Sequence, residues 1–584
     1  MLLDKIKFCS VRLFAVAVLF SGFAARLSAL PAKKYVTQNE DGSISVFNVD
    51  DDKVSVKYNQ RVDGFRNVTV IYGDKVKKQN PVTVDLSDFG GKEILVNFSC
   101  EMKIEDSTGA ENDIIWMINE VSADFPKLSE EKFKSGEWKK ISGSAMLSLS
   151  QKKQFYLSSF GLAKENLVFY IKDFEMKIEG DNLMGKTVEL KKWLEVPSLQ
   201  QAYSPYFDYF GLAVEYNELN SPSVMKGLKY HAGSVTMGND LKPDFLFNWK
   251  KPLSSALEDF VAEDGKTYKV PKGMPDFKNL PMILELAKDN GLKIRGHVLV
   301  WHEQTPAWFF NENYKSGAKA VLTDRDTMNA RLEWYIKSVL EYVRDWEIRR
   351  NGGEHIITVW DVVNEACADN ATETRWLREN SSWFKIFGDE SYIVNAFRYA
   401  NRYAPADVLL AYNDYGCYGG SNLSAGGKTN AVLRVIDAVQ SAPDARLDVV
   451  GMQSHVGMNY PAVTGTDSYE TALRKFLAKG VDVQVTELDI ANGDRPYNSI
   501  ALREKYHEYF DMFLRNRKTA GQNGISGVTI WGLRDEATWL NFQKQYKGKP
   551  QFPLLFQGED YRCKPAFFGV LDAAQNMTDK DTAK

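Results

Sequence analysis

From about residue 198 onward, short apolar runs alternate with longer stretches in which apolar residues recur every three or four positions. The short runs are typical of strands buried on both faces, and the longer stretches, such as DFKNLPMILELAKDNG and NARLEWYIKSVLEYVRDW, are typical of amphipathic helices. The expected strands lie at 211–215, 234–237, 294–300, 358–363, 408–413, 449–454, 481–486 and 528–532. This alternation predicts a (β/α)8 TIM barrel. A doubly wound open sheet is the alternative, but no Gly-x-Gly-x-x-Gly or P-loop motif follows an early strand.

Residues 35–180 show a different pattern, in which short β-type runs such as NVTVIYG, EILVNFSCEMKI and NLVFYIKDFEMKI are separated by turns. This pattern predicts an antiparallel β-sandwich that precedes the barrel. We therefore expect a junction at 181–197, a barrel domain at 198–575 and a C-terminal tail at 576–584.

The first 29 residues resemble an export signal. Lys5, Lys7 and Arg12 give a positive start, residues 13–20 are apolar, and Leu27-Ser28-Ala29 offers a small-x-small cleavage site. No later segment approaches 18 apolar residues, so we expect a secreted or periplasmic protein with no membrane anchor.

Composition narrows the possible partners. The net charge is −4 and 44% of residues are hydrophobic, so no basic excess points to nucleic acid. Aromatic residues reach 12%, which suits stacking on sugar rings, although large β-rich cores also use them. The chain has five cysteines and neither Cys-x-x-Cys nor His-x-x-x-His, which argues against a disulfide scaffold and a structural zinc site. A Cys367–Cys417 disulfide remains open, since both residues follow neighbouring strands.

Almost every expected barrel strand ends in polar or aromatic residues, and the active sites of such barrels lie at the C-terminal ends of the strands. The residues concerned are Asn239, Lys242, His297, Trp301, His302, Asn364, Glu365, Asn413, Asp414, Tyr415, Gln453, His455, Glu487, Asp489 and Trp531. One such ending could simply be solvated at the surface. Seven such strand endings on one rim indicate a functional site.

Among the carboxylates on this list, Glu365 and Glu487 follow strands four and seven, on opposite sides of the predicted barrel. Glycoside hydrolysis uses such a pair, one to protonate the leaving oxygen and one to attack the anomeric carbon or activate water. His455 and Asp489 could orient Glu487 and keep it ionised. A metal site is the rival use of these residues, but the histidines do not have ligand spacing, so we expect neither a metal nor a cofactor.

The motifs RGHVLVWHEQTPAWF, WDVVNEA, AYNDYG, GMQSH and VTELDI, in this order, closely resemble glycoside hydrolase family 10, the retaining endo-β-1,4-xylanases. The resemblance covers residues 198–575. It implies that Glu365 is the general acid/base and Glu487 the nucleophile, and that xylan is hydrolysed internally through a covalent glycosyl-enzyme. We expect xylan or xylo-oligosaccharides as substrate and a monomeric enzyme.

The same resemblance implies roles for the surrounding residues. Gln453 and His455 would be partners of the nucleophile, with Asp489 behind His455, and Asn364 would bind the sugar 2-OH. The other implied ligands are His297 and Trp301 at the floor of that subsite, Asn239 and Lys242 on the non-reducing side, Gln304 and Trp531 where a hexose CH2OH would lie, Trp539 as a second cleft aromatic, and Tyr415 beyond the scissile bond.

The chain departs from the family pattern at two positions. Gly238-Asn239 stands where the family often has Glu-Asn, so one distal sugar contact is expected to be missing. Gly416 stands where the family often has Asn after the aromatic residue, here Tyr415. This change could alter the part of the site that holds the leaving group.

In the sandwich, FYIKDFEMKIEG and GEWKKISGS are similar to carbohydrate-binding modules of the xylan-binding sandwich type. Trp138 is expected in the core rather than as a sugar platform. Asp173 could help hold a structural calcium ion, as in similar modules, but a surface position is the simpler interpretation.

Two other functions stay open. A related β-1,4-glucan or mixed-linkage glycanase is disfavoured by Gln304 and Trp531, which by the resemblance crowd a CH2OH group. A non-catalytic glycan-binding protein on a decayed barrel is disfavoured because both Glu365 and Glu487 are present.

Overall fold

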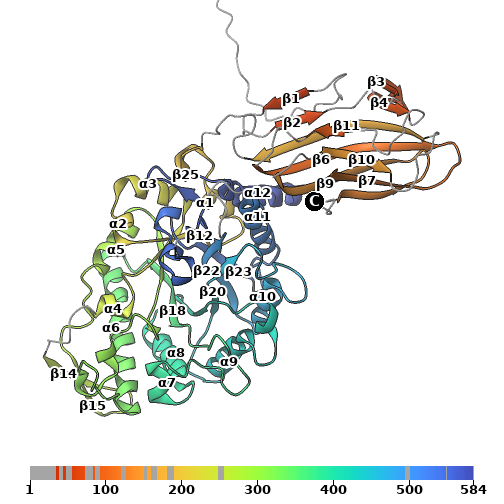
Figure 1. Cartoon of the computed structure of the whole chain (residues 1–584). Helices are drawn as coiled ribbons and strands as arrows, with labels where there is room; N and C mark the ends of the chain where they lie inside the picture. The colour runs from red at the N-terminus through yellow and green to blue at the C-terminus, as the bar shows by residue number, and fades with distance from the viewer. Residues whose placement is uncertain are drawn as a thin grey trace, which may run out of the picture. The chain divides into compact units, whose positions relative to one another are not determined.

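The computed structural model describes residues 35–38, 44–47, 55–72, 83–85, 92–119, 127–149, 154–159, 167–180, 190–247, 256–492, 500–547 and 549–582. The chain divides near residues 180–186 into two compact units, an N-terminal β-domain and a C-terminal α/β domain (Figure 1). The predicted export signal, residues 1–29, lies outside the described residues. Within the described part, no helix combines the length and the apolar character needed to span a bilayer.

The N-terminal unit contains two antiparallel sheets, as the pattern of short runs predicted. One has the order β1 (Tyr35–Gln38), β2 (Ile44–Phe47), β11 (Leu167–Gly180), β4 (Phe65–Tyr72) and β3 (Ser55–Val62), and β6 (Lys92–Asp106) joins β11 to β9 (Trp138–Leu149). The other has the order β5 (Thr83–Asp85), β10 (Gln154–Ser159), β7 (Asn112–Asn119) and β8 (Lys127–Phe133). Apolar side chains such as Val68, Val96 and Met176 are buried in this unit.

Trp138 is half-buried and so is not the core residue that we expected. Its ring packs edge-on against Phe65, with 5.5 Å between ring centroids, and its indole N–H donates to Asp63 at 3.0 Å. Asp173 is exposed, and its carboxylate lies 3.8 Å from the Lys172 ammonium.

The C-terminal unit is a closed barrel of eight parallel strands, so the predicted fold is confirmed. The sheet order is β16 (Lys293–Gly296), β13 (Ser234–Met237), β12 (Tyr209–Val214), β23 (Ile525–Ile530), β22 (Asp482–Ala491), β20 (Val449–Met452), β19 (Leu409–Asp414) and β18 (Ile357–Asn364). Pairing of β18 with β16 closes the ring. Two short strands, β17 (Val300–Trp301) and β21 (His455–Gly457), extend its C-terminal rim.

Helices surround the barrel strands (Figure 1). They are α1 (Leu199–Tyr203), α3 (Pro222–His231), α5 (Leu280–Asp289), α6 (Arg325–Asn351), α8 (Ser391–Tyr403), α9 (Lys428–Gln440), α10 (Tyr469–Leu477), α11 (Ile500–Arg515) and α12 (Pro565–Thr582), with short α2 (Tyr216–Leu219), α4 (Pro243–Leu246) and α7 (Ser382–Phe387) at the rim. The hairpin β14 (Leu257–Val261) and β15 (Thr267–Pro271) and the pair β24 (Phe556–Gln557) and β25 (Arg562–Cys563) complete the unit.

The ends of the longest helix, α6, follow from its sequence. Asp324 caps its N-terminus by accepting from the Thr327 N–H, and Gly352 ends it with φ +64°. Such a left-handed position favours glycine because a Cβ is disfavoured there.

Packing inside the barrel sets the position of the site. Trp360 is 2% exposed, in agreement with its expected core position. A Cβ on Gly296 would lie 2.4 Å from the Trp360 ring, so only glycine permits this packing. Asp361 is buried between Arg295 and His297, and His297 Nδ1 lies 2.8 Å from its carboxylate. The contact with Asp361 fixes the orientation of the His297 ring below the rim.

Cys100, Cys367, Cys417 and Cys563 are free and buried. The Cys367–Cys417 disulfide that the sequence left open is therefore not formed in this structure. Instead, Cys367 Sγ accepts a hydrogen bond from the Tyr412 hydroxyl at 3.2 Å.

Candidate active site

The two candidate catalytic carboxylates lie at the C-terminal rim of the barrel. Glu365 directly follows the last residue of β18, and Glu487 lies within β22, separated from β18 in the sheet by β19 and β20. Glu487 is 5% exposed and Glu365 is half-buried. Glu365 has φ +54°, a left-handed conformation that is uncommon for a side chain with a Cβ and that clusters at functional sites.

A chain of amide hydrogen bonds joins the two carboxylates. Asn364 Nδ2 donates to Glu365 Oε1 at 3.1 Å, and Asn364 Oδ1 accepts from Asn413 Nδ2 at 2.9 Å. Asn413 Nδ2 also donates to Glu487 Oε1 at 2.8 Å. Gly451 makes room for Asn413, since a Cβ there would lie 2.2 Å from Asn413 Oδ1. The two carboxylates therefore share one rigid polar network.

Glu487 is held in its ionised form. Burial alone would raise its pKa, but the hydrogen bond from His455 and the charges of His297, His455 and Lys242 lower the pKa of Glu487 to about 2. His455 Nε2 lies 3.3 Å from Glu487 Oε2 and Nδ1 lies 2.9 Å from Asp489 Oδ2. Burial would lower the pKa of His455, but these two carboxylates raise it to about 10. A protonated His455 therefore faces an ionised Glu487 at neutral pH.

Glu365 is shifted in the opposite direction. Burial, followed by the negative charges of Asp414 and Glu487, raises the pKa of Glu365. Hydrogen bonds to the carboxylate from Gln453 and Trp301 only partly offset this, with the Trp301 indole N–H donating at 3.0 Å. Two carboxyl groups whose pKa values are moved apart can serve as an acid and a nucleophile in one site.

The structure corrects the expected partner of Gln453. Its side-chain amide donates to Glu365 Oε1 at 2.9 Å and to Asn364 Oδ1 at 3.2 Å, rather than to the candidate nucleophile. Only its backbone carbonyl accepts from the Glu487 N–H, at 2.9 Å. The side-chain amide that holds the Glu487 carboxylate comes from Asn413 instead.

Sequence reasoning missed Lys428 as a site residue and placed Asp414 on the rim without giving it a role. Asp414 and Lys428 form an ion pair of 3.0 Å in which the two side chains are 1% and 2% exposed. Asp414 is the nearby charge that raises the pKa of Glu365 most. The sequence showed that Asp414 follows a strand, but Lys428 begins α9, and no motif links the two.

Asn239 and Lys242, expected on the non-reducing side, form one cluster with Gln304 beside Trp301. Lys242 Nζ lies 4.9 Å from the centroid of the Trp301 ring and donates to Gln304 Oε1 at 2.8 Å. Gln304 Nε2 donates to Asn239 Oδ1 at 3.1 Å. This cluster is connected to Glu365 through the Trp301 indole.

Trp531 and Trp539 follow β23 and are both half-buried. Trp531 packs edge-on against His297 and His455, with ring centroids 5.6 Å and 6.3 Å apart. Trp539 donates its indole N–H to Asp489 Oδ2 at 2.7 Å. Both aromatic residues thus contact the histidines or the carboxylate that surround Glu487.

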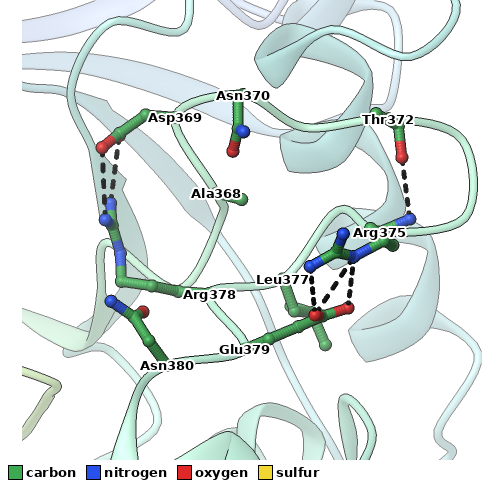
Figure 2. Close-up of a pocket in the computed structure, with 9 residues that line it drawn as sticks. All are labelled: Ala368, Asp369, Asn370, Thr372, Arg375, Leu377, Arg378, Glu379 and Asn380. Atoms are coloured by element: carbon green, nitrogen blue, oxygen red, sulfur yellow. Dashed lines mark hydrogen bonds and ion pairs between the residues drawn. The ribbon is translucent and has the colours of Figure 1, made fainter.

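Tyr415 lies on the other side of Glu365, next to a hollow in the loop after β18. Its hydroxyl donates to Asp369 Oδ1 at 2.6 Å and accepts from Arg378 at 3.2 Å, and Arg378 Nε also donates to the Glu365 carbonyl at 3.1 Å. Figure 2 shows the hollow, lined by Ala368, Asp369, Asn370, Thr372, Arg375, Leu377, Arg378, Glu379 and Asn380. Asp369 pairs with Arg378 on one side, and Arg375 pairs with Glu379 on the other. The hollow borders the site but is lined by neither Glu365 nor Glu487.

A (β/α)8 barrel with a carboxyl of raised pKa and an ionised carboxylate in one rim network is the arrangement that glycoside hydrolases of this fold use. The chain belongs to glycosyl hydrolase family 10, whose family model matches residues 198–573. The resemblance seen in the motifs is thereby confirmed.

Similar proteins agree with this membership. Endo-1,4-beta-xylanase B of Butyrivibrio fibrisolvens is 34% identical over 379 residues, which are 65% of this chain and 53% of that protein, so the chain spans about half of that relative's length. An intracellular xylanase from Thermoanaerobacterium saccharolyticum, solved with xylotetraose, is 28% identical with a TM-score of 0.51, covering 64% of this chain and 98% of that one.

One solved structure covers both domains. It contains the CBM22-1 and GH10 modules of a Clostridium thermocellum endo-1,4-beta-D-xylanase complexed with xylohexaose. It covers 93% of this chain and 96% of that one at a TM-score of 0.51, with 24% identity, and so shows a shared fold.

Proposed function

We propose that this protein is an endo-1,4-β-xylanase that cleaves internal β-1,4 bonds of xylan with retention of configuration. The observation that carries the proposal is the pair Glu365 and Glu487, which are connected through the side chains of Asn364 and Asn413. The pKa of Glu365 is raised and that of Glu487 is about 2. The xylanase names of the relatives support xylan as the substrate.

In this mechanism the protonated Glu365 carboxyl gives its proton to the glycosidic oxygen while a Glu487 carboxylate oxygen attacks the anomeric carbon. The C–O bond to the leaving sugar breaks and a covalent glycosyl-enzyme forms. The Glu365 carboxylate then removes a proton from a water molecule, whose oxygen attacks the same carbon and releases Glu487 as a carboxylate. Two inversions give net retention.

His455 and Asn413 would act by positioning Glu487 and favouring its ionised form, because both donate hydrogen bonds to it. Lys242 and Asn239 would bind hydroxyl groups of the sugars on the non-reducing side, and Gln304, which hydrogen-bonds both of them, would occupy the space of a hexose CH2OH. We further propose that the sandwich binds xylan and that the N-terminal segment directs export, on the sequence patterns described above.

Retention is tested by proton NMR of the first product formed from a xylo-oligosaccharide. We expect the β anomer to appear first and to convert slowly to the equilibrium mixture. Initial appearance of the α anomer would show inversion and would remove Glu487 as a covalent nucleophile. A parallel digestion of soluble cellulose tests the glucanase alternative.

Replacement of Trp531 by alanine is expected to relax discrimination against glucose. The side chain contacts His297 and His455, and by the family resemblance it fills the volume where a hexose CH2OH would lie. Xylan activity should fall through lost stacking, while the ratio of cellobioside to xylobioside kcat/KM should rise. One small group in a pocket typically changes the free energy of transition-state binding by about 1–3 kcal/mol. The ratio of cellobioside to xylobioside kcat/KM should therefore rise by roughly 10- to 200-fold at most.

Trp539→Ala is the matched control, since Trp539 follows the same strand but hydrogen-bonds Asp489. It should lower both rates together. If the ratio also stays constant in Trp531→Ala, Trp531 serves for stacking and discrimination lies elsewhere.

A further inference from the structure

Gly238 and Glu215 occupy complementary positions at the rim next to the cluster of Lys242, Asn239 and Gln304. Gly238 follows β13, and its N–H donates to the Val214 carbonyl at the end of β12, at 2.9 Å. A Cβ on Gly238 would lie 2.3 Å from Glu215 Oε1. The Glu215 carboxylate therefore fills the space that any side chain at position 238 would need.

Glu215 is joined directly to that cluster. Its Oε1 accepts from Asn239 Nδ2 at 3.0 Å, and Asn239 Oδ1 in turn accepts from Gln304 Nε2 at 3.1 Å. Trp301 links the same cluster to Glu365, as described above. Glu215 thus belongs to the hydrogen-bonded network of the non-reducing side.

The Glu215 carboxylate is accessible to a ligand. Glu215 is exposed, and its Oε1 is the acceptor for Asn239. Glu215 is the N-cap residue of α2 and forms a capping box with Glu218, in which the Glu215 N–H donates to Glu218 Oε2 at 2.9 Å, so its backbone is anchored. A carboxylate can accept several hydrogen bonds, so the anchored and exposed Glu215 is suited to accept a sugar hydroxyl in addition to these internal donors.

The electrostatic surroundings of Glu215 favour a hydrogen bond from such a hydroxyl to its carboxylate. Although the residue as a whole is exposed, surrounding protein atoms partly desolvate its carboxylate. This desolvation and the negative charges of Asp240 and Glu218 raise the pKa of Glu215 to about 7, against the opposing effect of Asn239 and Lys242. The negative charge of Glu215 is therefore only partly offset by its neighbours, so a hydrogen-bond donor from a ligand would stabilise the ionised carboxylate.

We propose that Glu215 is a substrate-binding residue whose carboxylate accepts a hydroxyl of the sugar next to the cleaved one on the non-reducing side. The sugar contact that is missing at Gly238, after β13, is then supplied by Glu215, after β12. The sequence predicted that this distal contact would be lost, whereas on this proposal a residue from the neighbouring strand end makes it. This proposal rests on the proposed xylanase function.

Two substrates separate the proposed contact from catalysis in general. An aryl β-xyloside occupies only the cleaved position, whereas an aryl β-xylobioside adds one sugar on the non-reducing side. Hydrogen bonds to charged groups contribute enough that Glu215→Ala should lower kcat/KM on the xylobioside by about 10- to 100-fold. Activity on the xyloside should change by less than about 2-fold.

Glu215→Gln tests whether Glu215 acts only by holding Asn239. Glutamine keeps an acceptor for Asn239 Nδ2 but loses the charge, so it should still lose about 5- to 10-fold on the xylobioside. Glu258→Gln, an exposed glutamate of β14, should leave both substrates unchanged and is the matched control. Thermal unfolding of each variant verifies that it is folded.

Two results would overturn the proposal: a ratio of kcat/KM between the two substrates that is unchanged in Glu215→Ala, whether or not both activities fall, or wild-type behaviour of Glu215→Gln. Loss confined to the xylobioside in both variants supports it. Failure of the proposed function is distinct, because the wild-type enzyme would then hydrolyse neither xylan nor the aryl xylosides.

Discussion

Glu487→Ala is expected to lower kcat on xylan by about 10⁴- to 10⁶-fold, the range for removing the nucleophile of an enzyme that forms a covalent intermediate. The physical reason is that the variant has no oxygen placed to attack the anomeric carbon. Asn413 and His455, which donate to Glu487 in the native protein, would be left facing a cavity. Steady-state kinetics on xylan measure the loss, and calorimetry confirms that the variant is folded.

Added azide identifies the role of Glu487 more specifically. With an activated aryl β-xylobioside, azide can enter the space of the lost carboxylate, bond to the anomeric carbon and displace the aryloxide, which takes the Glu365 proton. The expected product is the α-xylobiosyl azide. No rescue, or a β-azide, would contradict the assignment of Glu487 as the nucleophile.

Glu365→Ala is expected to lower kcat/KM on xylan by about 10²- to 10⁴-fold, the usual contribution of general acid–base catalysis. Aryl glycosides with acidic leaving groups need little proton donation, so their bond cleavage should be much less affected. The substrate dependence of the loss is therefore the main measurement.

The pH profile gives a second readout for Glu365. Its pKa is raised, and the acid must carry its proton, so wild-type activity is lost as pH rises through the pKa of Glu365. Glu487, with a pKa of about 2, must be ionised, so activity is lost at the acid end as pH falls toward that value. Glu365→Ala should lose the alkaline limb and retain the acid limb.

Glu379→Ala is a suitable control for Glu365→Ala. Glu379 lies in the same loop but lines the hollow of Figure 2, where it pairs with Arg375. Because that ion pair is largely exposed, its loss should cost little stability and leave the pH profile unchanged. An alkaline limb that survives in Glu365→Ala would assign proton donation to another group.

Local pattern determined the barrel and the two carboxylates. Each barrel strand is an apolar run, since its residues are buried on both faces, and the runs beginning at 211, 234, 294, 358, 408, 449, 481 and 528 all correspond to observed strands. The expected strand ending at Val363 stops just before Asn364-Glu365, and in a parallel barrel all such ends share one rim. Sequence order is therefore enough to place Glu365 and Glu487 in one site.

Tertiary structure decided which polar side chains pair within that site. Gln453 donates to Glu365 instead of the expected Glu487, Asn413 holds Glu487, and Lys428 reaches Asp414 from a helix. Likewise, Glu215, which follows β12, occupies the space beside Gly238, which follows β13. Each of these contacts joins residues from different elements, and each depends on strand order, register and rotamer at the scale of an ångström. The apolar periodicity of the chain records which residues are buried, but it carries no information on which polar atoms meet across the barrel.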